Sequence, residues 1–114
     1  MFKYCNSLSD ITALKNWNVS KGINFKSMFS HCSSLSDIQP LKNWNVSNGN
    51  DFKSMFKNCS SLSNVESLKY RDISKGFDFK RMFKNCSTNL NLKPLLKWKK
   101  YSDIGFEIFL NKVL

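Results

Sequence analysis

Histidine, arginine, glycine and long apolar runs are scarce in this chain, and their scarcity excludes several classes of function. Its 114 residues include one histidine, four glycines and two arginines. The sequence holds no glycine-rich phosphate loop, no HExxH motif and no nucleophile elbow, and its carboxylates are scattered. No apolar stretch approaches the roughly 20 residues of a membrane-spanning helix, and no secretory signal is visible. We therefore predict a soluble protein that is not an enzyme and carries no cofactor.

Positive charge, by contrast, is abundant. Lysine and arginine together number 18 against eight acidic residues, which gives a net charge of +10. An excess of this size attracts anionic surfaces at moderate salt. A chain rich in lysine and asparagine but poor in arginine and alanine also arises from A+T-rich coding. The charge alone therefore leaves both interpretations open.

An internal repeat organises the whole sequence. The pattern Met-Phe-x-x-Cys begins at Met1, Met28, Met55 and Met82, so each copy follows the last by 27 residues. Residues 1–27 and 28–54 are identical at 19 positions. Repeats of this length are supersecondary units that bury their apolar faces against their neighbours. We predict one domain, 1–114, composed of repeats 1–27, 28–54, 55–81 and 82–114.

The apolar positions of each repeat predict one short helix. Phe52, Met55, Phe56 and Cys59 hold positions i, i+3, i+4 and i+7, which share one face of a helix. The same spacing returns near the end of the chain, where it predicts a capping helix over about 103–113. Its members are Phe106, Phe109, Leu110 and Val113.

The residues on either side of the repeated helix predict its start and the segment after it. The residue in front of the helix can accept hydrogen bonds from first-turn N–H groups, and it is Asn24, Asp51 or Asp78. Two residues earlier stands a glycine that we expect to adopt a positive φ in a turn: Gly22, Gly49 or Gly76. After the cysteine, the alternation of Trp44-Asn45-Val46 predicts a short extended segment.

The repeat resembles a known family of surface proteins. The residues that carry the resemblance are Met28, Phe29, Cys32, Leu35, Ile38, Leu41, Trp44, Asn45, Val46 and Ser47, with equivalents in the copies on either side. Their pattern is similar to the leucine-rich repeats of BspA-like surface proteins and to related repeats of mycoplasma lipoproteins. The resemblance implies an α/β repeat solenoid, a leucine-rich-repeat-like stack of 27-residue units, each with a short strand and a short helix. It also implies adhesion or protein recognition, at the cell surface or in secreted form if the chain is a fragment of a larger family member, and otherwise in the cytoplasm.

The four cysteines lack the clustering of a zinc site and have no paired histidines, so we predict no metal. Stacked repeats would bring neighbouring cysteines within the Cα separation of a disulfide, but with nearly parallel Cβ vectors, which disfavours bridges. Val113 occupies the next position of the cysteine column, so an apolar residue suffices there. We interpret Cys32, Cys59 and Cys86 as buried core residues and Cys5 as more exposed.

Protein binding is our first functional hypothesis. Stacked units would present the polar residues that lie between the apolar columns as one regular face. The candidate protein-binding residues are Ser9, Asp10, Thr12, Ser36, Asp37, Gln39, Ser63, Asn64 and Glu66. The partner's identity does not follow from this pattern.

The alternative hypothesis is polyanion binding, to nucleic acid, anionic lipid or acidic glycan, with an affinity that falls steeply with salt. Lysines at equivalent repeat positions would form two ladders: Lys15, Lys42 and Lys69, and Lys26, Lys53 and Lys80. A merely solvated surface is the competing interpretation of these ladders. One repeat position holds Trp17, Trp44 and Trp98, and Arg71 interrupts this column. Tryptophans there could stack on the bases of a nucleic acid, but their alternation with valine favours packing in the core.

Overall fold

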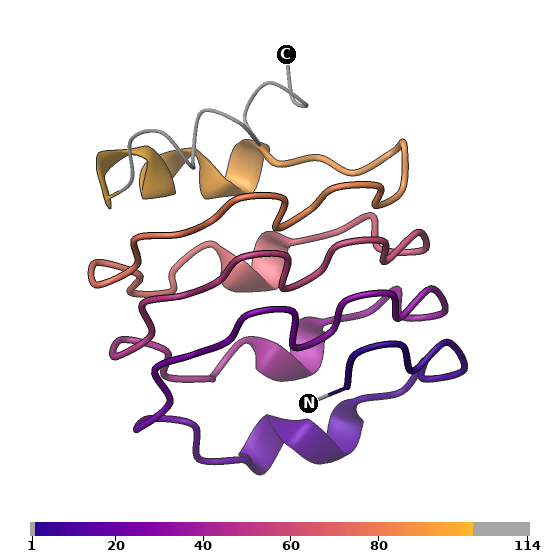
Figure 1. Cartoon of the computed structure of the whole chain (residues 1–114), viewed down its shortest axis with the longest axis horizontal. Coiled ribbons are helices and arrows are strands. Elements are labelled where there is room, and N and C mark those ends of the chain that lie inside the picture. The colour runs from indigo at the N-terminus through magenta and orange to yellow at the C-terminus, as the bar shows by residue number, and fades with distance from the viewer. Residues whose placement is uncertain (1, 102–114) are drawn as a thin grey trace.

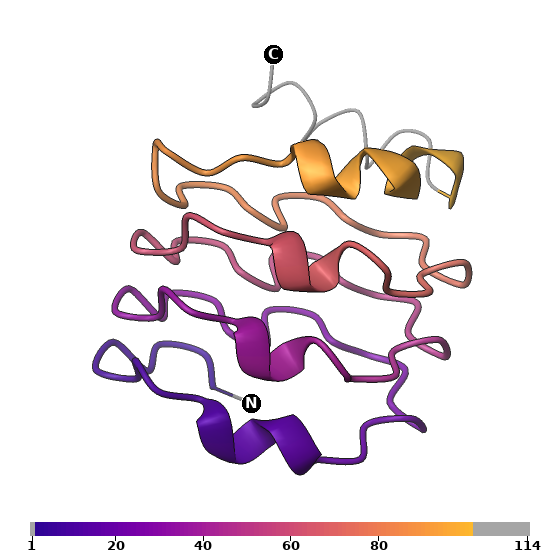
Figure 2. The ribbon, with the colours of Figure 1, turned by 180° about the vertical axis from the view of Figure 1, so that it is seen from behind.

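Four 3-10 helices occupy the same place in successive repeats. In the computed structural model, which describes residues 2–101, η1 spans Thr12–Asn16, η2 Gln39–Leu41, η3 Glu66–Leu68 and η4 Lys93–Tyr101. Each helix belongs to one circuit of the chain, and we call these circuits layers: layer 1 (2–23), layer 2 (24–50), layer 3 (51–77) and layer 4 (78–101). The layers lie one on another, with their helices along one side (Figure 2).

The opposite side of the layers consists of segments rich in turns that we call the front strips: 2–4, 24–31, 51–58 and 78–85 (Figure 1). Backbone hydrogen bonds join each strip to the next, because the Ser27 N–H donates to Lys53 O and the Ser54 N–H to Lys80 O, both at 2.9 Å. Isolated parallel bridges pair Asn24 with Asp51, and Asp51 with Asp78. Contacts thus recur at the 27-residue spacing of the sequence.

Aromatic columns fill the space between the strips and the helices. Phe29 and Phe56 stack with ring centroids 5.6 Å apart and planes at 4°, and Phe52 and Phe79 stack at 5.3 Å and 7°. All four rings are buried. Offset-stacked rings add about 0.5–1.5 kcal/mol per pair beyond the burial of their area, so these columns hold adjacent layers together.

The predicted helix over the Met-Phe-x-x-Cys segments is wrong. Phe52, Met55, Phe56 and Cys59 are all buried, as their spacing indicated, but the segment that carries them forms turns. Ser54 and Asn58 have φ angles of 58° and 62°, in the left-handed region that a right-handed helix does not tolerate. Their N–H groups donate to carbonyls of layer 4, so they do not bond back along the segment. A front strip therefore buries the same side chains that one face of a helix would bury.

The predicted α/β repeat solenoid and its leucine-rich-repeat character are also wrong. Residues 2–101 contain no strand, no sheet and no α-helix. The short helices lie just before the segments that were expected to be extended, since η2 ends at Leu41 and Trp44-Asn45-Val46 forms no strand. The chain is a compact globule with a Cα radius of gyration of 12.7 Å and extents of 33 × 32 × 20 Å. About 13 Å is expected for a globular chain of this length.

The repeated glycines do not adopt the positive φ that the sequence predicted. A Cβ on Gly49 would lie 2.6 Å from the Cζ atom of Phe52, and one on Gly76 would lie 2.4 Å from Cζ of Phe79. These separations are far shorter than any carbon–carbon contact. Glycine is therefore required because a phenylalanine ring occupies the space of its missing side chain.

The residues predicted as helix N-caps make the expected kind of hydrogen bond in a different element. Asp51 Oδ1 accepts from the Lys53 N–H at 3.0 Å, and Asn24 and Asp78 make the equivalent bond. Each of these residues begins a front strip, so their side chains fix a turn and do not start a helix. The predicted capping helix, about 103–113, lies outside the described residues. Within residues 2–101, no helix is long and apolar enough to cross a membrane.

Candidate functional site

Five of the predicted protein-binding residues line one open depression between layers 2 and 3. Ser36, Asp37 and Gln39 come from layer 2, and Asn64 and Glu66 from layer 3. The depression has a volume of about 500 Å³, and every residue that lines it has a polar side chain. All five side chains are exposed. The stacking of layers thus brings together residues that are 27 positions apart in the sequence.

Short-range hydrogen bonds fix the rim of this depression. Asp37 Oδ1 accepts from the Gln39 N–H at 2.9 Å, and Asn64 Oδ1 accepts from the Glu66 N–H at 2.8 Å. These bonds shape the turn that leads into each 3-10 helix and leave the other polar atoms of both side chains facing solvent. Glu66 also pairs with Lys69 across 3.8 Å, the one ion pair among residues 2–101. Such a rim presents ordered acceptors and two amide donor groups, those of Gln39 and Asn64.

Sequence reasoning missed one member of this depression, Ser67. Its hydroxyl donates to Ile38 O at 3.2 Å and ties η3 to layer 2. The equivalent residues are Ala13 and Pro40, so the column carried no polar signal. The other predicted residues, Ser9, Asp10, Thr12 and Ser63, are exposed but do not line the depression.

Asp10 shows how strongly these turns hold a carboxylate. The Thr12 hydroxyl and the Thr12 N–H, which lies 2.9 Å from Oδ1, lower the pKa of Asp10 below its ordinary value. Asp72 behaves alike, since the N–H and hydroxyl of Ser74 lower its pKa. Hydrogen bonds to the charged form favour ionisation, so these groups serve the turns as carboxylates and are poor proton donors.

The two predicted lysine ladders belong to different segments, the 3-10 helices and the front strips, which lie on opposite sides of the molecule (Figures 1 and 2). The first follows the 3-10 helices, with Lys15 inside η1 and Lys42 and Lys69 at the ends of η2 and η3. The second, Lys26, Lys53 and Lys80, occupies one position of the front strips. The structure therefore does not bring all six lysines together, and the two ladders form separate surfaces.

The front strips of layers 2 to 4 carry three further cations beside the second ladder: Lys57, Arg81 and Lys84. Cross-layer bonds set their places, because the His31 N–H donates to Lys57 O and the Asn58 N–H to Lys84 O, both at 2.7 Å. Arg81 was not among the predicted site residues. Its column otherwise holds Ser27 and Ser54, so the repeat gave no indication of a charge there.

The tryptophan column packs in the core where neighbouring layers cover it. Trp44 and Trp98 are each 2 % exposed, and Trp17 in layer 1 is 42 % exposed. Trp44 Nε1 donates to Leu14 O at 2.8 Å. Trp44 and Trp98 are therefore unavailable for stacking on bases, in agreement with the favoured sequence interpretation.

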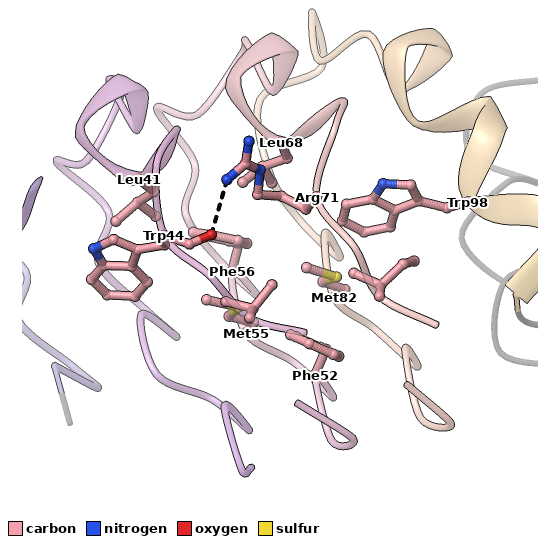
Figure 3. Close-up of a pocket in the computed structure, with 11 residues that line it drawn as sticks. Leu41, Trp44, Phe52, Met55, Phe56, Leu68, Arg71, Met82 and Trp98 are labelled. Atoms are coloured by element: carbon pink, nitrogen blue, oxygen red, sulfur yellow. Dashed lines mark hydrogen bonds between the residues drawn. The ribbon is translucent and has the colours of Figure 1, made fainter. Parts of the chain in front are cut away.

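Arg71 interrupts this column and borders a small internal cavity (Figure 3). Its Nη1 donates to Trp44 O at 2.9 Å, while its buried Nε has no hydrogen-bond partner, and neither does Nε1 of Trp98. The cavity, of about 20 Å³, is otherwise lined by apolar side chains such as Met55 and Met82. A space this small and apolar holds at most one water molecule, so it is a packing defect and no ligand site.

The cysteines do not provide reactive groups in the core. All four are free. Cys32 and Cys59 are buried and Cys5 is partly exposed, as predicted, but the predicted burial of Cys86 is wrong, because its side chain is also partly exposed. Burial, together with the neighbouring thiols, raises the pKa of Cys59 to about 12. Its Sγ donates to Phe29 O at 3.1 Å. A thiol held in this way is a core residue, because nucleophilic attack needs the thiolate.

Comparison with known proteins gives one finding on family. A family model described as "Mycoplasma protein of unknown function, DUF285" matches residues 1–100, which is most of the chain. No curated protein and no solved structure matches the chain.

Proposed function

This chain belongs to the DUF285 family of mycoplasma proteins, whose function is unknown, and we propose that it is a non-enzymatic module that binds a protein partner. The observation that carries the proposal is the polar depression between layers 2 and 3. Five residues singled out by their place between the apolar columns converge there from two layers.

The chemistry of the rim indicates which part of a partner enters the depression. Asp37 and Glu66 offer carboxylate oxygens, and Gln39 offers an amide that both donates and accepts. A lysine or arginine side chain on an exposed loop, with its neighbouring backbone amides, meets these groups with charge-assisted hydrogen bonds. We therefore expect the partner to contribute a basic side chain at the centre of the contact.

A peptide-display selection tests this proposal with variants that preserve the fold. The chain is panned against a random peptide library, and enriched peptides are measured against Asp37→Asn/Glu66→Gln. Asparagine already stands at the Asp37 position in layer 3, as Asn64, where it accepts the same turn hydrogen bond. The matched control, Asp10→Asn/Asp72→Asn, loses the same charge away from the depression.

We expect lysine- or arginine-containing peptides whose affinity falls at least about tenfold in the first variant, since a hydrogen bond to a charged group contributes about 1.5–3 kcal/mol. The control variant should bind like the wild type. Equal loss in both variants, or enriched peptides without basic residues, would contradict the proposal.

A further inference from the structure

The front strips of layers 2 to 4 carry a broad basic patch on the side away from the polar depression. Its six cations are Lys26, Lys53, Lys57, Lys80, Arg81 and Lys84, and none of them is buried. No carboxylate among residues 2–101 lies within ion-pairing distance of any of the six. Asp51 and Asp78 share the strips, and each uses Oδ1 for a backbone hydrogen bond.

The patch extends in two directions. Adjacent strips are bonded backbone to backbone, so equivalent lysines follow each other about 5 Å apart across the layers. Along each strip, Lys53 and Lys57 are four residues apart, as are Lys80 and Lys84. The resulting surface lies on the 33 × 32 Å face of the molecule. Such a layout fits a flat anionic surface better than a single strand of phosphates.

Exposed apolar side chains stand at both ends of the strips. Ile23 and Phe77 are 55 % and 69 % exposed at the turn where the strips begin. They share one column, because the Asn50 N–H donates to Ile23 O and the Phe77 N–H donates to Asn50 O. At the other end Tyr4, on the strip of layer 1, is 61 % exposed. Apolar and aromatic residues beside lysines are typical of proteins that rest on a membrane surface.

We propose that the front strips bind the headgroup region of an anionic lipid bilayer, with Ile23 and Phe77 entering its outer layer. The role is independent of the protein contact proposed for the depression. Lysine supplies compact positive charge without the bidentate geometry that favours arginine for nucleic acid. The tryptophans that could stack on bases are buried, apart from Trp17, which lies close to η1. The observations therefore favour lipid over a polynucleotide.

Vesicle sedimentation with the full chain tests the proposal. The vesicles contain phosphatidylcholine alone or with about 30 % phosphatidylglycerol, an anionic content of the order found in surfaces that attract basic segments. Binding is measured at about 0.1 M and about 1 M salt, between which the screening length falls from about 10 Å to about 3 Å. We expect binding to the anionic vesicles only, and its loss at high salt.

Two triple variants with equal change of charge locate the binding surface. Each lysine near an anionic leaflet strengthens binding by about fivefold, so Lys26→Glu/Lys53→Glu/Lys80→Glu should weaken it by about a hundredfold or more. The control, Lys15→Glu/Lys42→Glu/Lys69→Glu, changes the helix side and should leave most of the binding. A thermal melt of each variant confirms folding. Equal losses in both variants would show that net charge alone acts, and would overturn the assignment to the strips.

The apolar contact is tested separately. Ile23→Ser/Phe77→Ser should weaken binding to anionic vesicles by about tenfold or more while leaving its salt dependence intact. The depression variant Asp37→Asn/Glu66→Gln should bind vesicles normally, so that failure of one proposal does not imply failure of the other. Tighter binding to heparin or RNA than to vesicles, with no effect of Ile23→Ser/Phe77→Ser, would refute the lipid assignment.

Discussion

Replacing Arg71 by tryptophan should stabilise the protein, although it introduces the largest side chain into the core. Arg71 stands in the column of Trp44 and Trp98, beside a cavity of about 20 Å³ (Figure 3). An indole at this position should repeat the packing of Trp44, whose Nε1 donates to Leu14 O. By the 27-residue repeat, the corresponding acceptor for Arg71→Trp is Leu41 O.

The magnitude of the stabilisation is the sum of three contributions. Removal of the unpaired, buried Nε relieves about 1–3 kcal/mol. Filling the cavity adds about 0.5 kcal/mol at roughly 24 cal/mol per Å³. Loss of the charged hydrogen bond from Nη1 to Trp44 O costs about 1.5–3 kcal/mol, part of which the new indole bond returns. The net expectation is about 1 kcal/mol of stabilisation.

Urea unfolding followed by circular dichroism measures this difference. About 1 kcal/mol corresponds to a rise in Tm of about 4 °C for a domain of this size. Arg71→Met is the matched variant, because it removes the charge and the unpaired Nε but supplies no indole donor. It should be about as stable as the wild type and less stable than Arg71→Trp. An Arg71→Trp variant less stable than the wild type would refute the view that Arg71 is a defect in a tryptophan column.

Three further predictions concern the core. Phe56→Ala should destabilise the fold by about 3–5 kcal/mol in urea unfolding, because the ring is fully buried between two stacked neighbours; a loss under about 1 kcal/mol would contradict the stacked core. Gly49→Ala should cost about 1–3 kcal/mol, since its Cβ would lie 2.6 Å from Phe52 Cζ, and a neutral effect would show that the ring moves aside freely. Cys59 should react with iodoacetamide at about pH 8.5 far more slowly than Cys5, because burial raises the pKa of the Cys59 thiol to about 12; peptide mass spectrometry measures the labelling of each cysteine. The stability that the raised Cys59 pKa contributes is complete below about pH 9 and is lost as the pH rises towards 12. Equal labelling of both cysteines would show that the Cys59 thiol is not protected by burial.

Burial could be predicted from the repeat, whereas the secondary structure could not. Phe52, Met55, Phe56 and Cys59 are buried as expected, because any structure that stacks equivalent residues must cover the invariant apolar columns. Their i, i+3, i+4, i+7 spacing fits a helix, but a front strip with left-handed residues at intervals of four places the same side chains inward. Periodicity alone does not separate the two.

The residues with left-handed backbone conformation could not be predicted from the sequence. Ser27, His31, Ser54 and Asn58 adopt positive φ, and among them only histidine and asparagine are enriched in that region, whereas serine is not. The glycines, which suggested positive φ, are required for space beside phenylalanine rings. Cross-layer hydrogen bonds compensate the local strain, and those bonds exist only once the layers are stacked.

The candidate sites also include one feature that the sequence could predict and one that it could not. The lining of the depression was largely predictable, because exposed polar positions between apolar columns must share one face when repeats stack. The separation of the two lysine ladders was not, since it depends on which segment forms the strip and which forms the helix. Ser67 and Arg81 occupy columns with no consistent chemistry and carried no signal.

The central claim is that the two sides of the stacked layers serve different partners, and paramagnetic relaxation tests it most directly. A spin-labelled lipid in anionic bicelles is added to the ¹⁵N-labelled chain, and line broadening is measured for each backbone amide. We expect strong broadening at Lys26, Lys53 and Lys80 and little at Gln39 and Glu66, which lie on the helix side. Equal broadening on both sides, or broadening confined to the depression, would contradict the claim.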